Sequence, residues 1–245
     1  MRFARQHFAL LDSTSRHLAG LNLAECPEGL CISADAQSGG QGRQGRSWFS
    51  PPGENLYFSI LLKPAVEPSL AVTLPLLLGV CVAQTLDSFG LTARIKWPND
   101  IWVGERKLCG ILCEMQILAG SPAVICGLGI NVNQRTFPPE LESIATSMTL
   151  CAGEPFDRDT VLKRFLDVLG INYSLWLRSG LEPFAEFLNA RNALRDKTIA
   201  VAQGNRELRG TAGAINADGT LSLLQADGTL AAICSGEAHL SIRRG

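Results

Sequence analysis

A glycine-rich loop constrains the fold more than any other feature of this 245-residue sequence. Residues 40–47 read Gly-Gln-Gly-Arg-Gln-Gly-Arg-Ser, which matches a dinucleotide-binding pattern and, except for Arg46 in place of lysine, a phosphate-binding loop. Both motifs require a helix directly after the loop. Here the pair Pro51-Pro52 follows, and two prolines cannot continue a helix. The sequence therefore excludes both nucleotide-binding folds and predicts a strand, a loop and a second strand.

Apolar runs and turn signals predict an α+β domain over residues 1–193. We expect strands at 30–34, 56–62, 93–97, 108–118 and 123–132, with turns at 98–100 and 104–105. Helices are expected at 15–22, 74–89, 157–177 with Asp157 as the N-cap, and 183–190, and the segment 133–157 reads mostly as loop. These elements predict a mixed or antiparallel sheet with helices on one face.

The pattern changes after Leu194. Short β-prone runs are separated by Gly204-Asn205, Asp218-Gly219 and Asp227-Gly228, dipeptides that tight hairpins favour. Residues 194–245 therefore predict a small β-barrel domain.

Composition excludes several classes of protein. A net charge of -1, from 22 Lys+Arg and 23 Asp+Glu, gives no general attraction for nucleic acid or an anionic membrane. The uncharged stretch 69–86 contains polar residues and predicts a buried helix rather than a membrane span. The apolar run 8–11 is too short for a signal peptide. The 8 cysteines and 3 histidines have neither metal-ligand nor disulfide spacing, so we expect reduced, buried thiols in a cytoplasmic protein.

The chemistry of the glycine-rich loop predicts anion binding. Its three glycines allow backbone N–H groups to approach an anion, and Arg43 and Arg46 add forked cations that match phosphate or carboxylate. An ordinary flexible surface loop is the alternative that these residues leave open.

Several separated segments resemble, in order and spacing, those of the biotin-protein ligase family. They are residues 12–15, the loop 37–48, Lys-Trp-Pro-Asn-Asp at 96–100, Arg-Lys-Leu-Cys-Gly-Ile-Leu at 106–112, and Gly-Leu-Gly-Ile-Asn-Val-Asn at 127–133. The resemblance runs from about Phe8 to the C-terminus. It implies a class II synthetase-like biotin/lipoate ligase catalytic domain followed by an SH3-like β-barrel.

The resemblance implies a reaction in two steps. Biotin and Mg-ATP give biotinyl-AMP and pyrophosphate, and a lysine of the biotin carboxyl carrier protein of acetyl-CoA carboxylase then takes the biotinyl group. Cations must converge where the biotin carboxylate attacks the α-phosphate, because the two anions repel each other. Mg²⁺ would neutralise the departing pyrophosphate, and no protein ligand is assigned to it.

The resemblance also implies roles for individual residues. Catalysis falls to Lys107, Arg43 and Asp100, with Asp100 orienting the carrier lysine and receiving its proton. Biotin binding is assigned to Ser13, Thr14, Ser15, Gln37, Gln41, Gly42, Arg43 and Lys107. ATP binding is assigned to Arg43, Arg46, Trp48, Lys96, Asn99, Lys107 and Asn131. This chain departs from the family pattern at Gln41, which replaces a common arginine, and at Ser15, which replaces a frequent asparagine.

Most of these residues also have a structural explanation. Residues 13–15 suit a helix N-cap, residues 96–100 suit a charged surface turn, and a tryptophan such as Trp48 is often a core residue. Lys107 is different, since a cation beside the apolar run 108–112 needs a partner.

The adenylate is a mixed anhydride that water would hydrolyse, so the site needs a cover. We expect the loop 38–47 to be mobile without ligand and to order over the intermediate.

Three other functions stay open. Lipoate-protein ligases share the fold and the adenylation chemistry, although the loop and the Lys-Trp-Pro-Asn-Asp segment are of the biotin type. A nucleic-acid-binding protein would use the C-terminal barrel, but residues 191–245 carry seven basic and five acidic residues and no aromatic one, and only Arg243 is suspected of a functional role there. The third is a phosphate-binding regulatory module without catalysis.

Only about a dozen residues precede Ser13, whereas some bacterial relatives carry a helix-turn-helix domain there. We therefore expect a monofunctional ligase that does not bind an operator. A homodimer is compatible with the sequence.

Overall fold

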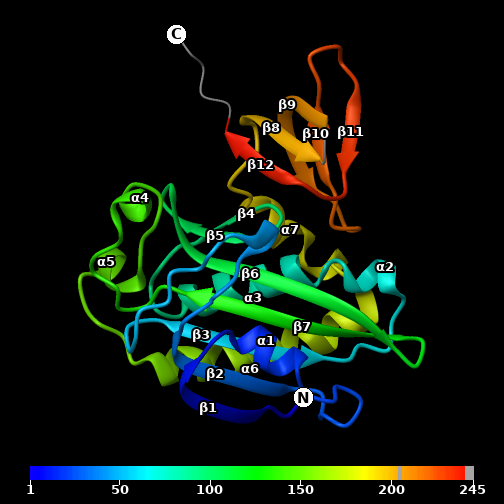
Figure 1. Ribbon diagram of the computed structural model, residues 1–245. Helices are drawn as coiled ribbons and strands as arrows, with labels where there is room; N and C mark the ends of the chain where they lie inside the picture. Colours follow the sequence, from blue (N-terminus) through cyan, green and yellow to red (C-terminus); the bar gives the residue numbers. More distant parts are fainter. Residues whose placement is uncertain (204–205, 241–245) are drawn as a thin grey trace.

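The computed structural model describes residues 1–203 and 206–240 and contains two sheets (Figure 1). The larger is a 7-stranded mixed sheet in the order β1-β2-β3-β7-β6-β5-β4. Its strands are β1 (Ala4–Leu11), β2 (Leu30–Gln37), β3 (Leu56–Leu62), β4 (Arg94–Lys96), β5 (Asp100–Val103), β6 (Arg106–Leu118) and β7 (Ser121–Ile130). β1 and β2 pair in parallel and every other pair is antiparallel. The expected mixed sheet is confirmed, with β3 at the predicted bounds.

Two long helices cover one face of this sheet. α3 (Leu74–Asp87) is buried along most of its length, and α6 (Arg158–Ser179) packs against it. Asp157 caps α6 by accepting a hydrogen bond from the backbone N–H of Thr160 at 2.7 Å, as expected. Pro68–Asp87 is long and apolar enough to cross a membrane, but 72% of its most apolar window is buried inside the protein. The segment therefore packs as a core helix.

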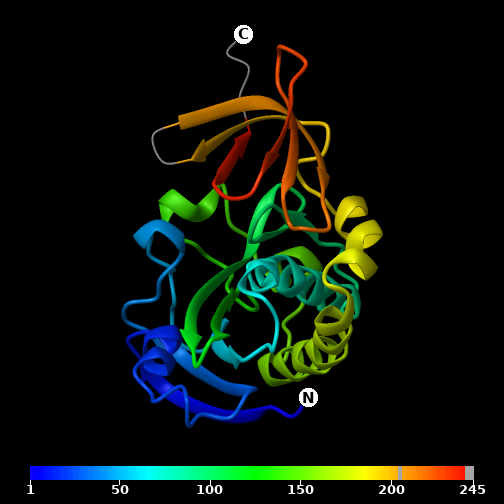
Figure 2. The same ribbon diagram turned by 90° about the vertical axis from the view of Figure 1, so that its right-hand side faces the viewer.

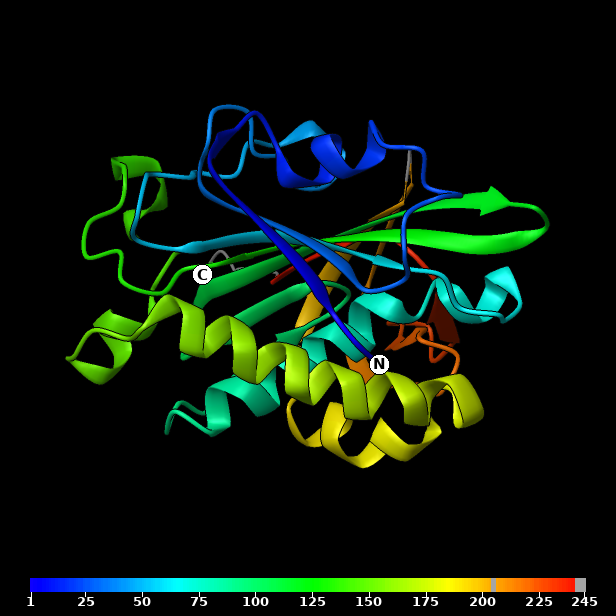
Figure 3. The ribbon, with the colours of Figure 1, turned by 90° about the horizontal axis from the view of Figure 1, so that it is seen from below.

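A short helix lies on the opposite face. Seen from below, α1 (Thr14–Ala19) is on one side of the sheet, and α3, α6 and α7 (Ala185–Ala190) are on the other (Figure 3). Leu18 of α1 packs with Ile32, Leu61 and Ile125, which alternate along their strands with residues facing α3. α1 was expected on the same face as the long helices, and its placement matters because its N-terminus enters the pocket described below.

Some elements differ from the expectation. β1 and β5 were not predicted: β1 is a mostly exposed edge strand without alternation, and β5 occupies residues 100–103 between two expected turns. The expected loop 133–157 contains two short helices, α4 (Pro139–Glu142) and α5 (Met148–Ala152). The remaining helical segments are α2 (Pro68–Ala71) and two single 3-10 turns, Arg43–Gly45 and Glu182–Phe184.

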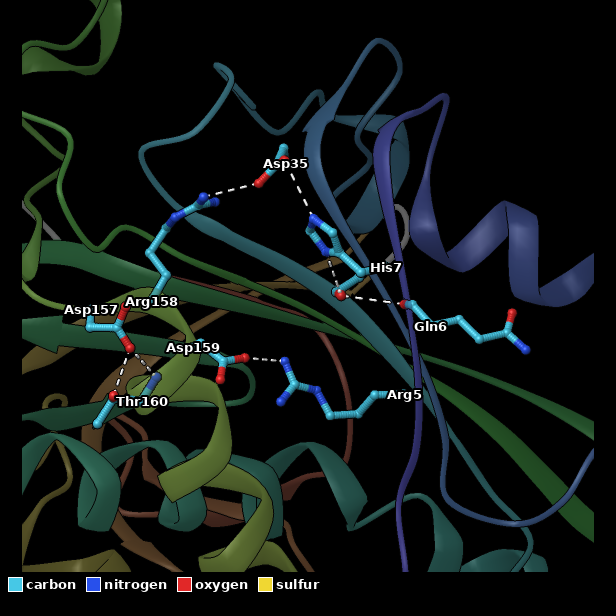
Figure 4. A network of polar contacts seen from close by, with 9 residues as sticks. Arg5, Gln6, His7, Asp35, Asp157, Arg158, Asp159 and Thr160 are labelled. Carbon is cyan, nitrogen blue, oxygen red and sulfur yellow. Dashed lines mark hydrogen bonds and ion pairs between the residues drawn. The ribbon is translucent and has the colours of Figure 1, made fainter.

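Charged contacts fasten β1 to its neighbours (Figure 4). Arg5 forms an ion pair with Asp159 at the start of α6. Asp35 of β2 lies 3.3 Å from His7 Nε2 and accepts a hydrogen bond of 2.9 Å from Arg158. These contacts connect the edge strand, its parallel neighbour and α6 at a place remote from the pocket.

The smaller sheet has five antiparallel strands in the order β11-β10-β9-β8-β12. They are β8 (Thr198–Gln203), β9 (Arg206–Ile215), β10 (Leu221–Leu224), β11 (Leu230–Ile233) and β12 (Glu237–Leu240). Within the described residues β11 and β12 form its two edges, so the expected barrel takes the form of a small sheet that does not close. Gly219 and Gly228 adopt φ of 83° and 86° in the predicted hairpin turns. Gly204-Asn205 and Arg243 lie outside the described residues.

The smaller sheet sits at one end of the larger one and shares its core (Figures 1 and 2). Trp97, which follows β4, donates a hydrogen bond from Nε1 to the carbonyl of Gly219 at 3.0 Å. Asn192 donates to the carbonyl of Gly213 at 3.0 Å. One cluster of buried apolar side chains runs through both sheets. All eight cysteines are free, as expected, but Cys151 and Cys234 are exposed rather than buried.

Candidate active site

A cavity of about 480 Å³ lies between the glycine-rich loop, the central strands and β12. Every residue assigned to a site from the sequence lines it. These residues are Ser13, Thr14, Ser15, Gln37, Gln41, Gly42, Arg43, Arg46, Trp48, Lys96, Asn99, Asp100, Lys107 and Asn131. The fold thus gathers segments from four separate parts of the chain around one pocket.

The N-terminus of α1 forms one end of the pocket. Ser13 is the N-cap and accepts a hydrogen bond from the backbone N–H of Arg16 at 3.4 Å. The backbone N–H of Thr14 donates to Gln37 Oε1 at 2.8 Å, so the end of β2 is joined to the helix. Thr14 and Ser15 are also buried. The hydroxyl run therefore caps a helix and lines the cavity at the same time.

The glycine-rich loop closes on itself through a few backbone bonds. The N–H of Gly42 donates to the carbonyl of Arg46 at 2.7 Å, and the N–H of Trp48 donates to the carbonyl of Gly40 at 2.9 Å. A Cβ at Gly40 would lie 2.7 Å from Ser50 Oγ, so this position requires glycine. No helix follows the loop before β3, which confirms the exclusion of the two nucleotide-binding motifs.

Lys107 and Asp100 form an ion pair inside the pocket. The β5–β6 hairpin carries both, and Lys107 Nζ lies 2.7 Å from Asp100 Oδ1. The expected partner of Lys107 is therefore a residue that the sequence also placed in the site. Lys107 Nζ also lies 5.2 Å from the centre of the Trp48 ring, within the range of a cation–π contact.

The two loop arginines have different environments. Arg43 donates from Nη1 to Asn99 Oδ1 at 3.0 Å, and Asn99 donates from Nδ2 to the carbonyl of Ile111 at 2.8 Å. Arg43 is thereby connected to the turn between β4 and β5, and through Asn99 to β6. Arg46 instead lies 2.6 Å from Glu237 of β12, so it connects the loop to the smaller sheet.

Lys96 adds a further cation at the same place. Burial lowers the pKa of its ammonium group from the ordinary value, while the nearby Asp100 carboxylate acts in the opposite direction. Its Nζ lies 5.0 Å from the centre of the Trp102 ring. A partly desolvated cation close to Lys107 and Arg46 would be stabilised by a bound polyanion.

Three glycines of the central strands were missed by the sequence analysis. Gly110 of β6 and Gly129 of β7 are direct partners in the sheet, and the Trp48 indole lies against both: a Cβ at Gly129 would be 2.4 Å from Trp48 Nε1. A Cβ at Gly127 would be 2.4 Å from Ser15 Oγ. A sequence signal was present for Gly127 and Gly129. Two glycines separated by one residue of a strand leave one face of that strand without side chains.

The remaining walls come from segments without a local motif. Asn131 is buried and donates from Nδ2 to the carbonyl of Thr146 at 2.9 Å. Phe137, Leu141 and Ile144 line the pocket beside it, and Glu237, Ala238 and His239 close it from the smaller sheet.

Among the described side chains, the buried Nε1 atoms of Trp48 and Trp102 have no hydrogen-bond partner. The described part of the chain also holds no cluster of three or more His, Cys, Asp or Glu side chains that could bind a metal ion.

The arrangement has a hydroxyl-lined end, several cations and the glycine-rich loop along one side. Fold and pocket together define an α+β ligase-type domain that can hold an acid and a polyanionic co-substrate side by side. The comparisons agree with this class. The model of the Biotin/lipoate A/B protein ligase family matches residues 7–131. The chain belongs to this family.

The chain is similar to individual named ligases. It is 38% identical over 178 residues to the bifunctional ligase/repressor BirA of Bacillus subtilis, covering 71% of this chain and 55% of that protein. It is 30% identical over 196 residues to the biotin–[acetyl-CoA-carboxylase] ligase of Paracoccus denitrificans, covering 77% of this chain and 81% of that one. The chain thus spans little more than half the length of the Bacillus relative.

The structure is similar over almost its whole length to a solved ligase. The biotin protein ligase from Aquifex aeolicus in complex with biotin and ATP superimposes with a TM-score of 0.86 at 31% identity, covering 97% of this chain and 98% of that chain. Both sheets therefore have counterparts in the solved structure.

Proposed function

We propose that the protein is a biotin–[acetyl-CoA-carboxylase] ligase. It would activate biotin with ATP as biotinyl-5'-AMP and transfer the biotinyl group to a lysine of the biotin carboxyl carrier protein. The supporting observation is a single pocket that combines buried hydroxyls with Lys107, Arg43 and Lys96. The Aquifex structure, whose ligands are biotin and ATP, is similar over 97% of this chain.

In the first step an oxygen of the biotin carboxylate attacks the α-phosphorus of ATP, and the bond from that phosphorus to the pyrophosphate oxygen breaks. Both reactants are anions. Lys107 and Arg43 would bring them together and stabilise the charge that develops on the phosphate oxygens. Because Lys107 lies on a hydrogen-bonded hairpin and is oriented by Asp100, its ammonium group would need little reorganisation.

The hydroxyl-lined end is the proposed biotin site. Ser13, Thr14, Ser15 and Gln37 would bind the ureido ring, and Gln41 and Gly42 would approach through the loop backbone. A backbone contact at Gln41 would be unaffected by its departure from the common arginine. The opposite end, with Arg46, Trp48, Lys96, Asn99 and Asn131, would hold the nucleotide.

Mg²⁺ enters with ATP as part of the substrate. Since the described chain offers no cluster of acidic, histidine or cysteine ligands, the phosphate oxygens themselves would supply most of its ligands. There it would neutralise charge on the departing pyrophosphate.

In the second step the amine of the carrier lysine attacks the biotinyl carbonyl carbon, and the bond to the AMP oxygen breaks. Asp100 would orient this amine and accept a proton from it. Asp100 lines the pocket and already pairs with one ammonium group, that of Lys107. The catalytic unit would be residues 1–193, with residues 194–245 as an accessory domain that contributes Glu237 to the pocket.

The loop would protect the adenylate between the two steps. We expect amide hydrogen exchange in residues 38–47 to slow when biotin and ATP are both added, because the loop then packs over the intermediate. Exchange that is equally slow with and without ligands would contradict this role.

The test is ATP–pyrophosphate exchange with biotin, lipoate or octanoate as the acid. We expect exchange with biotin alone, followed by labelling of a biotin carboxyl carrier domain. Exchange driven by lipoate or octanoate would favour a lipoate ligase, and no exchange with any acid would favour a phosphate-binding regulatory module.

The protein would act in the cytoplasm without a nucleic-acid partner.

A further inference from the structure

Ser59 lies beneath the hydroxyl-lined end of the pocket without lining it. It belongs to β3, is fully buried, and faces the side of the sheet that carries α1. Its Oγ lies 2.8 Å from Thr14 Oγ1 and 2.9 Å from Ser15 Oγ. A buried hydroxyl in the middle of a sheet therefore contacts two hydroxyls of the proposed biotin site.

The orientation of the Gln37 amide fixes one end of this network. The backbone N–H of Thr14 can only donate, so the Gln37 atom that it contacts at 2.8 Å is the carbonyl oxygen Oε1. The other end of the amide, Nε2, then donates to Ser50 Oγ at 3.1 Å, and Ser50 donates to the carbonyl of Trp48 at 3.0 Å. Both ends of the amide are consistent with this assignment.

The directions of the hydroxyl hydrogens follow in order. Gln37 Oε1 only accepts, so its contact with Thr14 Oγ1, at 3.3 Å, is a bond only when Thr14 donates its single hydroxyl hydrogen to that oxygen. All of these contacts can then be bonds at once in one order alone: Ser59 donates to Thr14, and Ser15 donates to Ser59. Each hydroxyl has one hydrogen, and this chain of bonds uses all three inside the protein.

The pocket is consequently left with a defined polarity. In this order of donors Thr14 and Ser15 offer lone pairs to a ligand, so they suit its N–H groups. Ser13 Oγ accepts from the backbone N–H of Arg16. Within the described chain its own hydroxyl hydrogen has no acceptor, so this hydrogen can be donated to a ligand carbonyl. Two acceptors beside one donor complement a cyclic urea, whose carbonyl is flanked by N–H groups.

The contact between Ser15 and Ser59 requires a glycine on the strand next to Ser59. Gly127 of β7 is the direct partner of Ser59, and a Cβ there would lie 2.4 Å from Ser15 Oγ and 3.5 Å from Ser59 Oγ. Any side chain at Gly127 would push Ser15 away from Ser59. The glycine and the serine on neighbouring strands thus act together to place one hydroxyl.

We propose that Ser59 is a positioning residue for substrate choice: by orienting the hydroxyls of Thr14 and Ser15 as acceptors, it makes the pocket selective for an acid with ring N–H groups. This inference rests on the proposed ligase function. It also gives a physical reason for rejecting lipoate, which has no N–H to donate and would leave both acceptors unpaired.

The experiment compares Ser59→Ala and Ser59→Cys with the unmodified protein in ATP–pyrophosphate exchange. The acids are biotin and a biotin methylated on a ureido nitrogen. Ser33→Ala is the matched control, because Ser33 is a buried serine of the neighbouring strand whose hydroxyl contacts His7, outside the pocket. Thermal unfolding of each variant reports on folding separately.

We expect Ser59→Ala to raise the KM for biotin about tenfold while the KM for ATP and kcat change by less than about twofold. Discrimination against methylated biotin should shrink, because Ser15 is then no longer held as an acceptor for a ureido N–H group. Ser59→Cys keeps a weaker donor of similar size and should fall between the two, and Ser33→Ala should match the unmodified protein.

Three results would each overturn the role of Ser59. They are an unchanged KM for biotin in Ser59→Ala, unchanged discrimination against methylated biotin, and a KM that rises equally for biotin and ATP in both Ser59→Ala and Ser59→Cys. Failure of the unmodified protein to exchange pyrophosphate with biotin would instead overturn the proposed function. The two failures are therefore distinguishable.

Discussion

The Lys107–Asp100 pair combines the cation proposed for the first step with the carboxylate proposed for the second. Both side chains are partly exposed to the pocket, 33% and 17%, so a ligand can reach either of them. A bound carboxylate or phosphate would compete with Asp100 for the ammonium group of Lys107. Asp100 would then be released to contact the amine of the carrier lysine.

Replacing Lys107 by alanine should reduce biotin-dependent pyrophosphate exchange about a hundredfold or more, because a charge contact to the transition state is lost. The measurement is kcat for exchange, with the unfolding temperature followed in parallel. Lys197→Ala is the control, since Lys197 is similarly exposed, at 30%, and lies 3.8 Å from Glu105 outside the pocket. Normal exchange in Lys107→Ala would refute its assignment.

At the scale of elements, few side-chain contacts hold the glycine-rich loop against the rest of the molecule. Arg43 reaches Asn99 and Arg46 reaches Glu237, so each arginine fastens the loop to a different part of the molecule. A loop held in this way can open for substrates and still close in one geometry.

Arg43→Gly should loosen this cover rather than abolish the reaction. The change removes the bond to Asn99 and adds backbone freedom, so we expect faster release of biotinyl-AMP and biotin labelling of unrelated lysines. Filter binding of radiolabelled adenylate measures its release, and blotting with an added bystander protein measures the labelling. Retention as tight as that of the unmodified protein would contradict a covering role for Arg43.

The network around β1 should stabilise the fold in a pH-dependent way. Partial burial raises the pKa of Asp35, but hydrogen bonds from Arg158 and His7 outweigh it, so the net pKa lies below its ordinary value. A carboxyl whose pKa is lowered by folding adds stability above its unfolded pKa, and this stability is lost as the pH falls through the folded pKa.

Asp35→Asn should therefore lower the free energy of unfolding by about 1 kcal/mol at neutral pH, a modest value because the network is partly exposed. The difference should shrink as the pH is lowered to about 3, below the ordinary pKa of an aspartate. Urea unfolding at both pH values checks this, with Asp167→Asn on the exposed face of α6 as the control. A difference that persists unchanged in acid would exclude the ion network as its cause.

At the scale of the whole molecule, the two sheets share one apolar core. Ile199, Val201 and Leu221 of the smaller sheet belong to the same buried cluster as Trp97 and Ile101 of the larger one. Two units with a continuous core should lose structure together. We therefore expect one calorimetric unfolding transition.

Trp97→Phe should lower the temperature of that single transition, with a loss of about 2 kcal/mol, because it removes the bond to Gly219 and leaves a cavity between the sheets. Differential scanning calorimetry of the full chain is the measurement. Two separate transitions in the unmodified protein, or a Trp97→Phe variant in which only one of two transitions moves, would show that the sheets unfold independently.

Much of the larger domain could be predicted from local patterns. β3, α3 and the cap of α6 were predicted because apolar periodicity and Asp157 are local signals. β1 and β5 were missed for a common reason: an exposed edge strand and a four-residue strand carry little alternation, and their pairing with β2 and β6 stabilises them.

The sequence alone determined the class of protein and many of the residues that line the pocket, through the resemblance of its loop and its Lys-Trp-Pro-Asn-Asp segment to those of the biotin-protein ligase family. Only the tertiary structure decided how these residues pair: Lys107 with Asp100, Arg46 with Glu237, and Ser59 beneath Thr14 and Ser15. Such contacts depend on strand register and on the helix that crosses the sheet. Since register is set by the packing of the whole sheet, residues far apart in the chain become partners only once the fold is complete.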